Sequence, residues 1–137
     1  GKGFLLYEIK QMLPKIKVVG FDTSKYGIKN AKKEIQANLY VHKAEEKYKF
    51  SDKEFDLVIS IGCLHNLQVF DVEKALQEIS RVGKKSYVLV ESFRNDEELF
   101  NLQCWALTCQ SFFNVDEWKW LYKKFGFIGD YEFIYFE

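Results

Sequence analysis

The chain has 137 residues, of which 47% are hydrophobic and 29% charged, and this composition is typical of one globular domain rather than a disordered or fibrous protein. Lys and Arg together number 20, as do Asp and Glu, so the formal net charge is zero and we expect no nucleic-acid partner. No apolar run approaches membrane-spanning length, and three cysteines cannot all pair within one chain, which favours a cytoplasmic location.

Helix and strand patterns alternate along the whole chain. Ser24, Asp71 and Asn114 are candidate N-caps in front of apolar residues at helical spacing, whereas other segments are short β-branched or apolar runs typical of strands. The first part of the chain is predicted to form a helix over 3–13, a strand over 16–21, a helix with apolar positions between 28 and 35, and a strand over 39–41. A loop over 43–54 then leads to a strand over 55–61 that is buried on both faces, a helix from Asp71 to Gly83, and a strand over 86–91. The last predicted elements are helices over 96–110 and 115–125 and a strand over 131–136. This alternation predicts a single α/β domain with a mostly parallel sheet.

Two features at predicted strand and helix ends indicate a nucleoside ligand. The turn Gly1-Lys2-Gly3 leads into a helix, where missing Cβ atoms let a ligand approach backbone N–H groups. Asp22 ends the next strand 22 − 3 = 19 residues after Gly3, close to the spacing of about 20 at which an acidic residue binds an adenosine ribose. A dinucleotide fingerprint needs a third glycine where Leu6 stands, and no phosphate loop occurs, so a nucleoside cofactor without phosphates fits better than NAD or ATP.

The order of these features resembles the class I S-adenosylmethionine-dependent methyltransferases along essentially the whole chain. The matching segments are the Gly1-Lys2-Gly3 turn, residues 19–24 with the acidic Asp22, Ala44-Glu45, residues 55–60 with the following Leu64-His65, Gly83, and Gly126-Phe127. The resemblance implies a Rossmann-like, doubly wound sheet that is mostly parallel, carries helices on both faces and ends in an antiparallel strand. The family's first strand is missing, so we expect residues 1–137 to be a methyltransferase-like domain that is incomplete at its N-terminus.

The same resemblance implies a set of cofactor contacts. Gly1 and Gly3 would lie beneath the methionine portion of S-adenosylmethionine, and Asp22 would hold the ribose. The remaining expected contacts are Thr23 beside the adenine, Ala44 and Glu45 at the adenine edge, and Ile61 and Gly62 near the sulfur. Family members often carry an acidic residue where this chain has Lys43, which leaves the side-chain contact to the adenine amino group unassigned.

Catalytic and substrate residues are expected beyond the fourth and fifth strands of that family fold. His65 is the candidate general base because its ordinary pKa lies near neutrality, although a histidine that only packs or caps is an equal alternative. Residues 92–113 are the expected substrate-side insertion, in which Phe93, Arg94 and Trp105 are candidate substrate contacts. No metal is expected, since Cys104 and Cys109 lack the surroundings of a ligand set.

The sequence therefore predicts an S-adenosylmethionine-dependent methyltransferase that acts on a small molecule. A Rossmann-type NAD(P)-dependent oxidoreductase is the second hypothesis, and Leu6 argues against it. A non-catalytic methyltransferase-like binding module is the third, motivated by Lys43 and by the single uncertain base.

Overall fold

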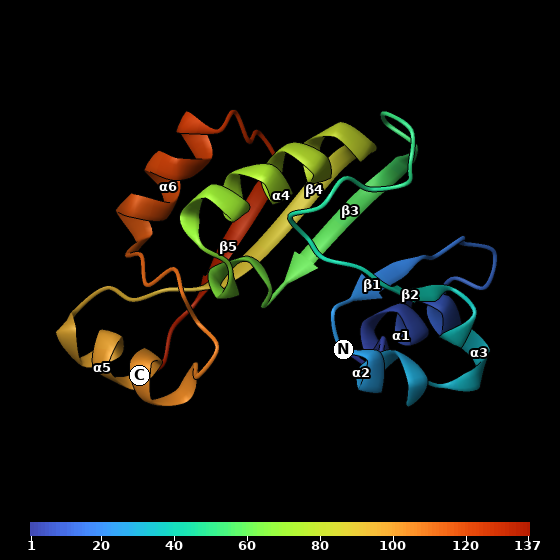
Figure 1. Cartoon of the computed structure of the whole chain (residues 1–137), viewed down its shortest axis with the longest axis horizontal. Coiled ribbons are helices and arrows are strands. Elements are labelled where there is room, and N and C mark those ends of the chain that lie inside the picture. Colours follow the sequence, from blue (N-terminus) through green and yellow to red (C-terminus); the bar gives the residue numbers. More distant parts are fainter. The chain divides into compact units, whose positions relative to one another are not determined.

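The computed structural model describes all 137 residues, and they form two compact units, Gly1–Glu46 and Lys47–Glu137. Both units combine helices with parallel strands, as the alternating patterns predict (Figure 1). None of the helices combines the length and apolar character needed to cross a bilayer.

The first unit is built from short elements. In chain order they are α1 (Phe4–Met12), β1 (Gly20–Asp22), α2 (Lys25–Lys29), α3 (Lys33–Gln36) and β2 (Leu39–Val41). The two strands pair in parallel, with Gly20 opposite Leu39. Ile35 is fully buried, and a Cβ on Gly3, which has φ +68°, would approach the Ile35 side chain to 2.7 Å. Glycine at this turn therefore allows both the left-handed backbone and the close packing.

The predicted helix after Ser24 is divided into α2 and α3. The Ser24 hydroxyl accepts a hydrogen bond from the Gly27 N–H at 2.9 Å, which confirms the predicted cap. Helix α2 ends at its C-cap, Asn30, whose backbone N–H and side-chain amide both donate to the Tyr26 carbonyl, at 3.0 Å and 2.8 Å. The side chain of Gln36 in α3 donates hydrogen bonds to carbonyl groups at the C-terminal end of α2, where helices in general leave carbonyls without intrahelical partners.

The second unit holds a three-stranded parallel sheet in the order β3-β4-β5. Its elements are β3 (Phe55–Ile61), the short 3-10 helix η1 (Leu64–Asn66), α4 (Val69–Val82), β4 (Gly83–Glu91), α5 (Asp96–Trp105), α6 (Val115–Lys124) and β5 (Asp130–Ile134). Helix α4 buries one stripe of apolar residues at the predicted helical spacing, consisting of Val72, Ala75, Leu76 and Ile79. Trp118 of α6 is fully buried and stacks on Tyr122, which makes α6 a second core helix.

Three details of the second unit correct the sequence predictions. Strand β5 runs parallel to β4, and not antiparallel, because the segment containing α5 and α6 returns the chain to the edge at which β4 starts. Helix α4 begins at Val69 with Gln68 as its N-cap, and not with Asp71, whose carboxylate lies in the first turn and pairs with Lys74. Strand β3 is an edge strand with Leu57 51% exposed, so it is not buried on both faces.

Helix α4 passes directly into β4 without a loop. Val82 ends the helix and Gly83 is both its C-cap and the first residue of the strand. A Cβ on Gly83 would come within 2.8 Å of the Lys85 carbonyl oxygen and 2.9 Å of the Val58 side chain, so a larger residue would not fit without a shift. Lys53 donates to the Gly83 carbonyl at 3.0 Å and holds the loop before β3 against this junction.

Candidate active site

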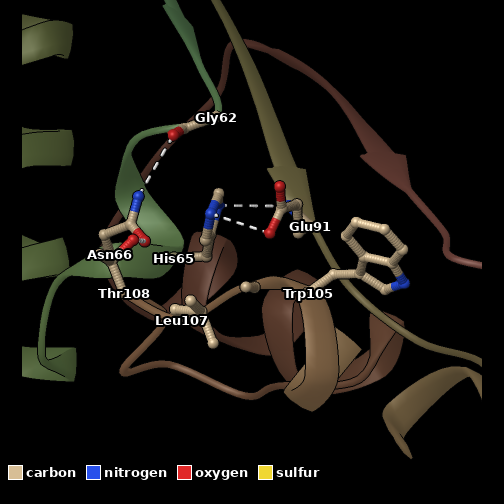
Figure 2. A pocket seen from close by; sticks show the side chains of 8 residues that line it. Gly62, His65, Asn66, Glu91, Trp105, Leu107 and Thr108 are labelled. Carbon is tan, nitrogen blue, oxygen red and sulfur yellow. Dashed lines mark hydrogen bonds and ion pairs between the residues drawn. The ribbon is translucent and has the colours of Figure 1, made fainter. Parts of the chain in front are cut away.

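A cavity of about 320 Å³ lies at the carboxyl ends of β3 and β4 in the second unit. It is lined by Gly62, His65, Asn66, Glu91, Trp105, Ala106, Leu107 and Thr108. These residues come from the turn after β3, from the last position of β4, and from the end of α5 with the segment that follows it (Figure 2). The carboxyl ends of parallel strands are where open α/β sheets bind their ligands.

His65 and Glu91 contact each other in the lining of this cavity (Figure 2). The Glu91 backbone N–H donates to His65 Nδ1 at 3.3 Å, so in the neutral ring the proton is carried by Nε2. His65 Nε2 in turn lies 3.1 Å from Glu91 Oε2. One residue of β4 thus contacts both ring nitrogens, which fixes the imidazole and the carboxylate relative to each other.

The contact between His65 and Glu91 is not a salt bridge of two charges. Burial lowers the pKa of His65 to about 4, so the imidazole is neutral at physiological pH. Burial also raises the pKa of Glu91. Glu91 Oε2 is buried and lacks a donor in hydrogen-bond alignment, although His65 Nε2 is within ion-pair distance. The site therefore contains a desolvated carboxylate that is incompletely satisfied by the protein.

Hydrogen bonds attach the segment after α5 to the turn after β3. The Thr108 hydroxyl donates to Asn66 Oδ1 at 2.7 Å, and the Asn66 amide donates to the Gly62 carbonyl at 3.3 Å. The His65 carbonyl accepts the N–H groups of Gln110 and Ser111, both at 3.0 Å. These hydrogen bonds fix the two walls of the cavity, the turn after β3 and the segment after α5, relative to each other.

Apolar side chains at the mouth of the cavity are open to solvent. Trp105 is 74% exposed and Leu107 is 88% exposed, although both line the cavity. A ligand that covers them would remove apolar surface from water at roughly 25 cal/mol per Å². The cavity thus combines one partly buried carboxylate with an exposed apolar rim, a common composition of small-molecule sites.

Three of the sequence-predicted residues of the second unit come together at this cavity. Gly62, His65 and Trp105 line it, while Ile61 ends β3 just before it. The other two, Phe93 and Arg94, are not among the lining residues and remain predictions.

The guanidinium of Arg94 is already engaged by protein groups. It pairs with the carboxylates of Glu98 and Glu137 and lies 4.2 Å from the centre of the Tyr135 ring. This arrangement leaves Arg94 less capacity for an anionic ligand than the sequence suggested.

The predicted cofactor residues of the first unit gather around Asp22 at the carboxyl ends of β1 and β2. The Ser24 N–H donates to Asp22 Oδ1 at 2.8 Å, and the Gly1 ammonium pairs with Asp22 Oδ2. Burial by itself would raise the pKa of Asp22, but hydrogen bonds from the Gly1 ammonium and from the Ser24 N–H outweigh it and hold the pKa below 3.8. The His42 N–H donates to the Asp22 carbonyl at 3.2 Å, which joins the ends of the two strands.

The other predicted contacts of this unit flank those strand ends. Thr23 follows β1 and is exposed, whereas Ala44, which follows β2, is buried, with Glu45 half-buried beside it. Gly3 precedes α1 at the turn described above. Their roles toward a cofactor stay predictions.

Sequence reasoning missed Glu91, Asn66, Ala106, Leu107 and Thr108. Glu91 carries a signal that could have identified it, because it is the last residue of a buried strand, just as Asp22 is the last residue of β1. The other four are recognisable only once the fold brings the turn after β3 to the segment after α5.

Comparisons with known proteins agree on the fold. A family model described as a methyltransferase domain matches residues 1–126. Among solved structures, the chain is similar to the PH0226 protein from Pyrococcus horikoshii OT3, with a TM-score of 0.66 and 18% identity over 90% of this chain and 68% of the other. No significant match was found among curated proteins. The similarity to the solved structure supports the predicted Rossmann-like α/β fold.

Proposed function

Because the chain belongs to the family of methyltransferase domains, we propose that it uses S-adenosylmethionine to methylate a small-molecule acceptor. One observation carries the proposal beyond the family: the incompletely satisfied Glu91 carboxylate lines a cavity at the carboxyl ends of β3 and β4, and hydrogen bonds join the two walls of that cavity. The size of the cavity, about 320 Å³, and the zero net charge of the chain favour a small acceptor over a nucleic acid.

The residues around Asp22 fit the nucleoside part of such a cofactor. The Asp22 side chain remains 34% exposed, and its carboxylate uses only part of its acceptor capacity on Gly1 and Ser24. A carboxylate offers about four lone-pair sites, so it can also accept hydrogen bonds from ribose hydroxyls.

When bound, the sulfonium of the cofactor supplies an electrophilic methyl carbon. The task of the chain is to orient an acceptor atom toward that carbon and to exclude water, which in general accounts for much of such a rate enhancement. Gly62, Asn66 and Thr108 form a hydrogen-bonded wall of the cavity, and the exposed Trp105 indole offers apolar surface to a bound acceptor.

Calorimetric titration with S-adenosylhomocysteine tests the cofactor assignment. We expect saturable binding, and we expect Asp22→Ala to weaken it at least about tenfold because hydrogen bonds to a charged group are worth roughly 1.5–3 kcal/mol. Glu8→Ala removes an exposed carboxylate from α1 of the same unit and is the matched control. Absence of binding, or equal binding by the Asp22→Ala variant, would refute the proposal. Binding without methyl transfer to any component of a small-molecule extract would instead support a non-catalytic module.

A further inference from the structure

We propose that the cavity binds a small amine as methyl acceptor, that Glu91 is the carboxylate that binds the amino group, and that His65 is a positioning residue. This inference rests on the proposed methyl transfer and adds the chemical class of the acceptor. It follows from the charges that line the cavity, the contacts of His65, and the exposed indole of Trp105.

The charged groups of the cavity favour a cation. Its eight lining residues include one carboxylate, that of Glu91, and no Lys or Arg. A partly buried carboxylate is favoured by a neighbouring cation, and Glu91, whose side chain is 20% exposed, has one buried oxygen, Oε2, without an aligned donor. Burial accordingly raises the pKa of Glu91. A protonated amine supplies both the charge and the N–H donors, whereas an anionic acceptor would be repelled.

Trp105 gives the amine a second favourable contact. Its indole lines the cavity and is 74% exposed, so its face is available to a ligand. Attraction between a cation and an indole ring contributes about 0.5–1 kcal/mol at exposed sites and more when water is excluded. An amine attached to an apolar body would therefore cover Trp105 and Leu107 while its nitrogen lies at Glu91.

The geometry of His65 argues that Glu91, and not His65, takes the proton. Nδ1 accepts the Glu91 N–H, and Nε2 of the neutral ring carries the hydrogen and lies 3.1 Å from Glu91 Oε2 outside hydrogen-bond alignment, so neither ring nitrogen offers a lone pair to a ligand. His65 is also buried, with an exposed fraction of 3%. Its ring packs against the Glu91 carboxylate, with 3.1 Å between Nε2 and Oε2, and this contact restricts where the carboxylate can lie.

The reaction balances with these groups. One proton passes from the bound ammonium to the Glu91 carboxylate, which leaves a lone pair on the nitrogen. The nitrogen forms a bond to the methyl carbon while the carbon–sulfur bond breaks and its electron pair stays on sulfur. The products are the N-methylated ammonium and S-adenosylhomocysteine, and the proton held by Glu91 is returned to water.

The binding test compares three probes of similar size: benzylammonium, benzyl alcohol and benzoate. We expect the full chain to bind benzylammonium in preference to the other two, as followed by the NMR signal of the Trp105 indole N–H. Glu91→Gln keeps the shape of the side chain but removes its charge, and we expect at least about a tenfold loss of amine affinity. Glu97→Gln, which removes an exposed carboxylate from α5, is the matched control and should bind the amine normally.

Other outcomes separate this inference from the cofactor proposal. Unchanged amine affinity in Glu91→Gln, preference for benzoate, or no saturable binding of benzylammonium at millimolar concentration would each overturn the amine assignment. Failure of the unaltered chain to bind S-adenosylhomocysteine refutes the cofactor proposal but does not affect the amine titration. An unchanged urea unfolding midpoint of the second unit in Glu91→Gln shows that the variant is folded.

The positioning role of His65 is tested by rescue. His65→Ala should weaken benzylammonium binding because Glu91 loses its support, whereas His65→Gln keeps a neutral N–H donor and should restore most of the affinity. Urea unfolding of both variants reports any general loss of stability. If the two variants bind equally, at equal stability, His65 has no specific effect on Glu91 and the positioning assignment fails.

Discussion

The two units of this chain differ most in how much apolar surface they bury. In Gly1–Glu46 the buried apolar residues are Ile35 and Ala44, and no residue of α1 is buried. In Lys47–Glu137 a continuous core is formed by Tyr48, Leu64, Val72, Ala75, Leu76, Ile79, Val82, Val88, Val90, Leu102, Cys109, Trp118, Leu121, Tyr122 and Phe127.

The residues around Asp22 in the first unit and the cavity in the second unit are therefore supported by different amounts of packing. The residues around Asp22 are carried by three-residue strands and short helices, whereas Glu91 ends a nine-residue strand beside a fourteen-residue helix. Local stability follows buried contacts, so we expect the first unit to open more often and to gain more order when a ligand binds.

The largest effect should come from removing one fully buried side chain in each unit. Trp118→Ala should lower the free energy of unfolding of the second unit by about 3–5 kcal/mol, the usual cost of deleting a buried aromatic residue. Ile35→Ala should accelerate amide hydrogen exchange in β1 and β2 while leaving β3 and β4 protected. Urea unfolding and hydrogen exchange followed by mass spectrometry measure the two effects.

Trp120→Ala is the matched control for the larger change. Trp120 lies on the same helix but is 60% exposed, so its removal should change stability by less than about 0.5 kcal/mol. The contrast between the units fails if Ile35→Ala removes protection from all strands equally.

The next largest difference between the units should appear when the pH is lowered, because the buried His65 lies in the second unit. The pKa of His65 falls from 6.5 when unfolded to about 4 in the folded chain, so the stability that neutral His65 contributes is present above pH 6.5 and is lost as the pH falls toward 4. The slope is at most about 1.4 kcal/mol per pH unit. Urea unfolding of the second unit between pH 7 and pH 4 should show this decline.

The raised pKa of Glu91 acts in the opposite direction, because it favours the protonated folded form. The measurement is therefore made in a Glu91→Gln background, with and without His65→Gln. A decline of equal slope in both proteins would contradict the assignment to His65.

Helix caps should give the smallest difference between the units. The Asn114 side chain accepts the Glu117 N–H at 2.9 Å and Glu117 returns a bond to the Asn114 N–H, so Asn114→Ala should destabilise the second unit by about 1 kcal/mol. Ser24→Ala removes the cap of the five-residue helix α2 and should change only amide exchange in the first unit. A larger global effect of Ser24→Ala than of Asn114→Ala would reverse the ranking.

Local signals were sufficient to predict most elements from the sequence. The cap at Ser24, the capping box at Asn114 and the C-cap at Gly83 depend on neighbouring residues, and the structure confirms all three. The direction of β5 could not be predicted from its alternating side chains, because alternation is the same in parallel and antiparallel strands.

Residues of the candidate site could be predicted from the sequence only where they directly follow a predicted strand. His65 and Gly62 follow β3 in sequence, so the rule that ligands bind after strands identified both. His65 contacts Glu91, which lies 91 − 65 = 26 positions later in the sequence, and Thr108 donates a hydrogen bond to Asn66, which lies 42 positions earlier. Such pairs depend on packing between elements, which a single sequence does not encode in a local pattern.

The direct junction of α4 with β4 has a consequence for how the chain can change its length. From Gly83 to Glu91 the strand takes 91 − 83 = 8 steps, and side chains alternate between its two faces at every step. Inserting or deleting one residue within β4 would turn the Glu91 carboxylate to the face of the fully buried Val88 and Val90. Because no loop separates α4 from β4, an insertion or deletion could not be compensated at Gly83. The number of residues in β4, as much as the identity of its last residue, therefore keeps the carboxylate in the cavity.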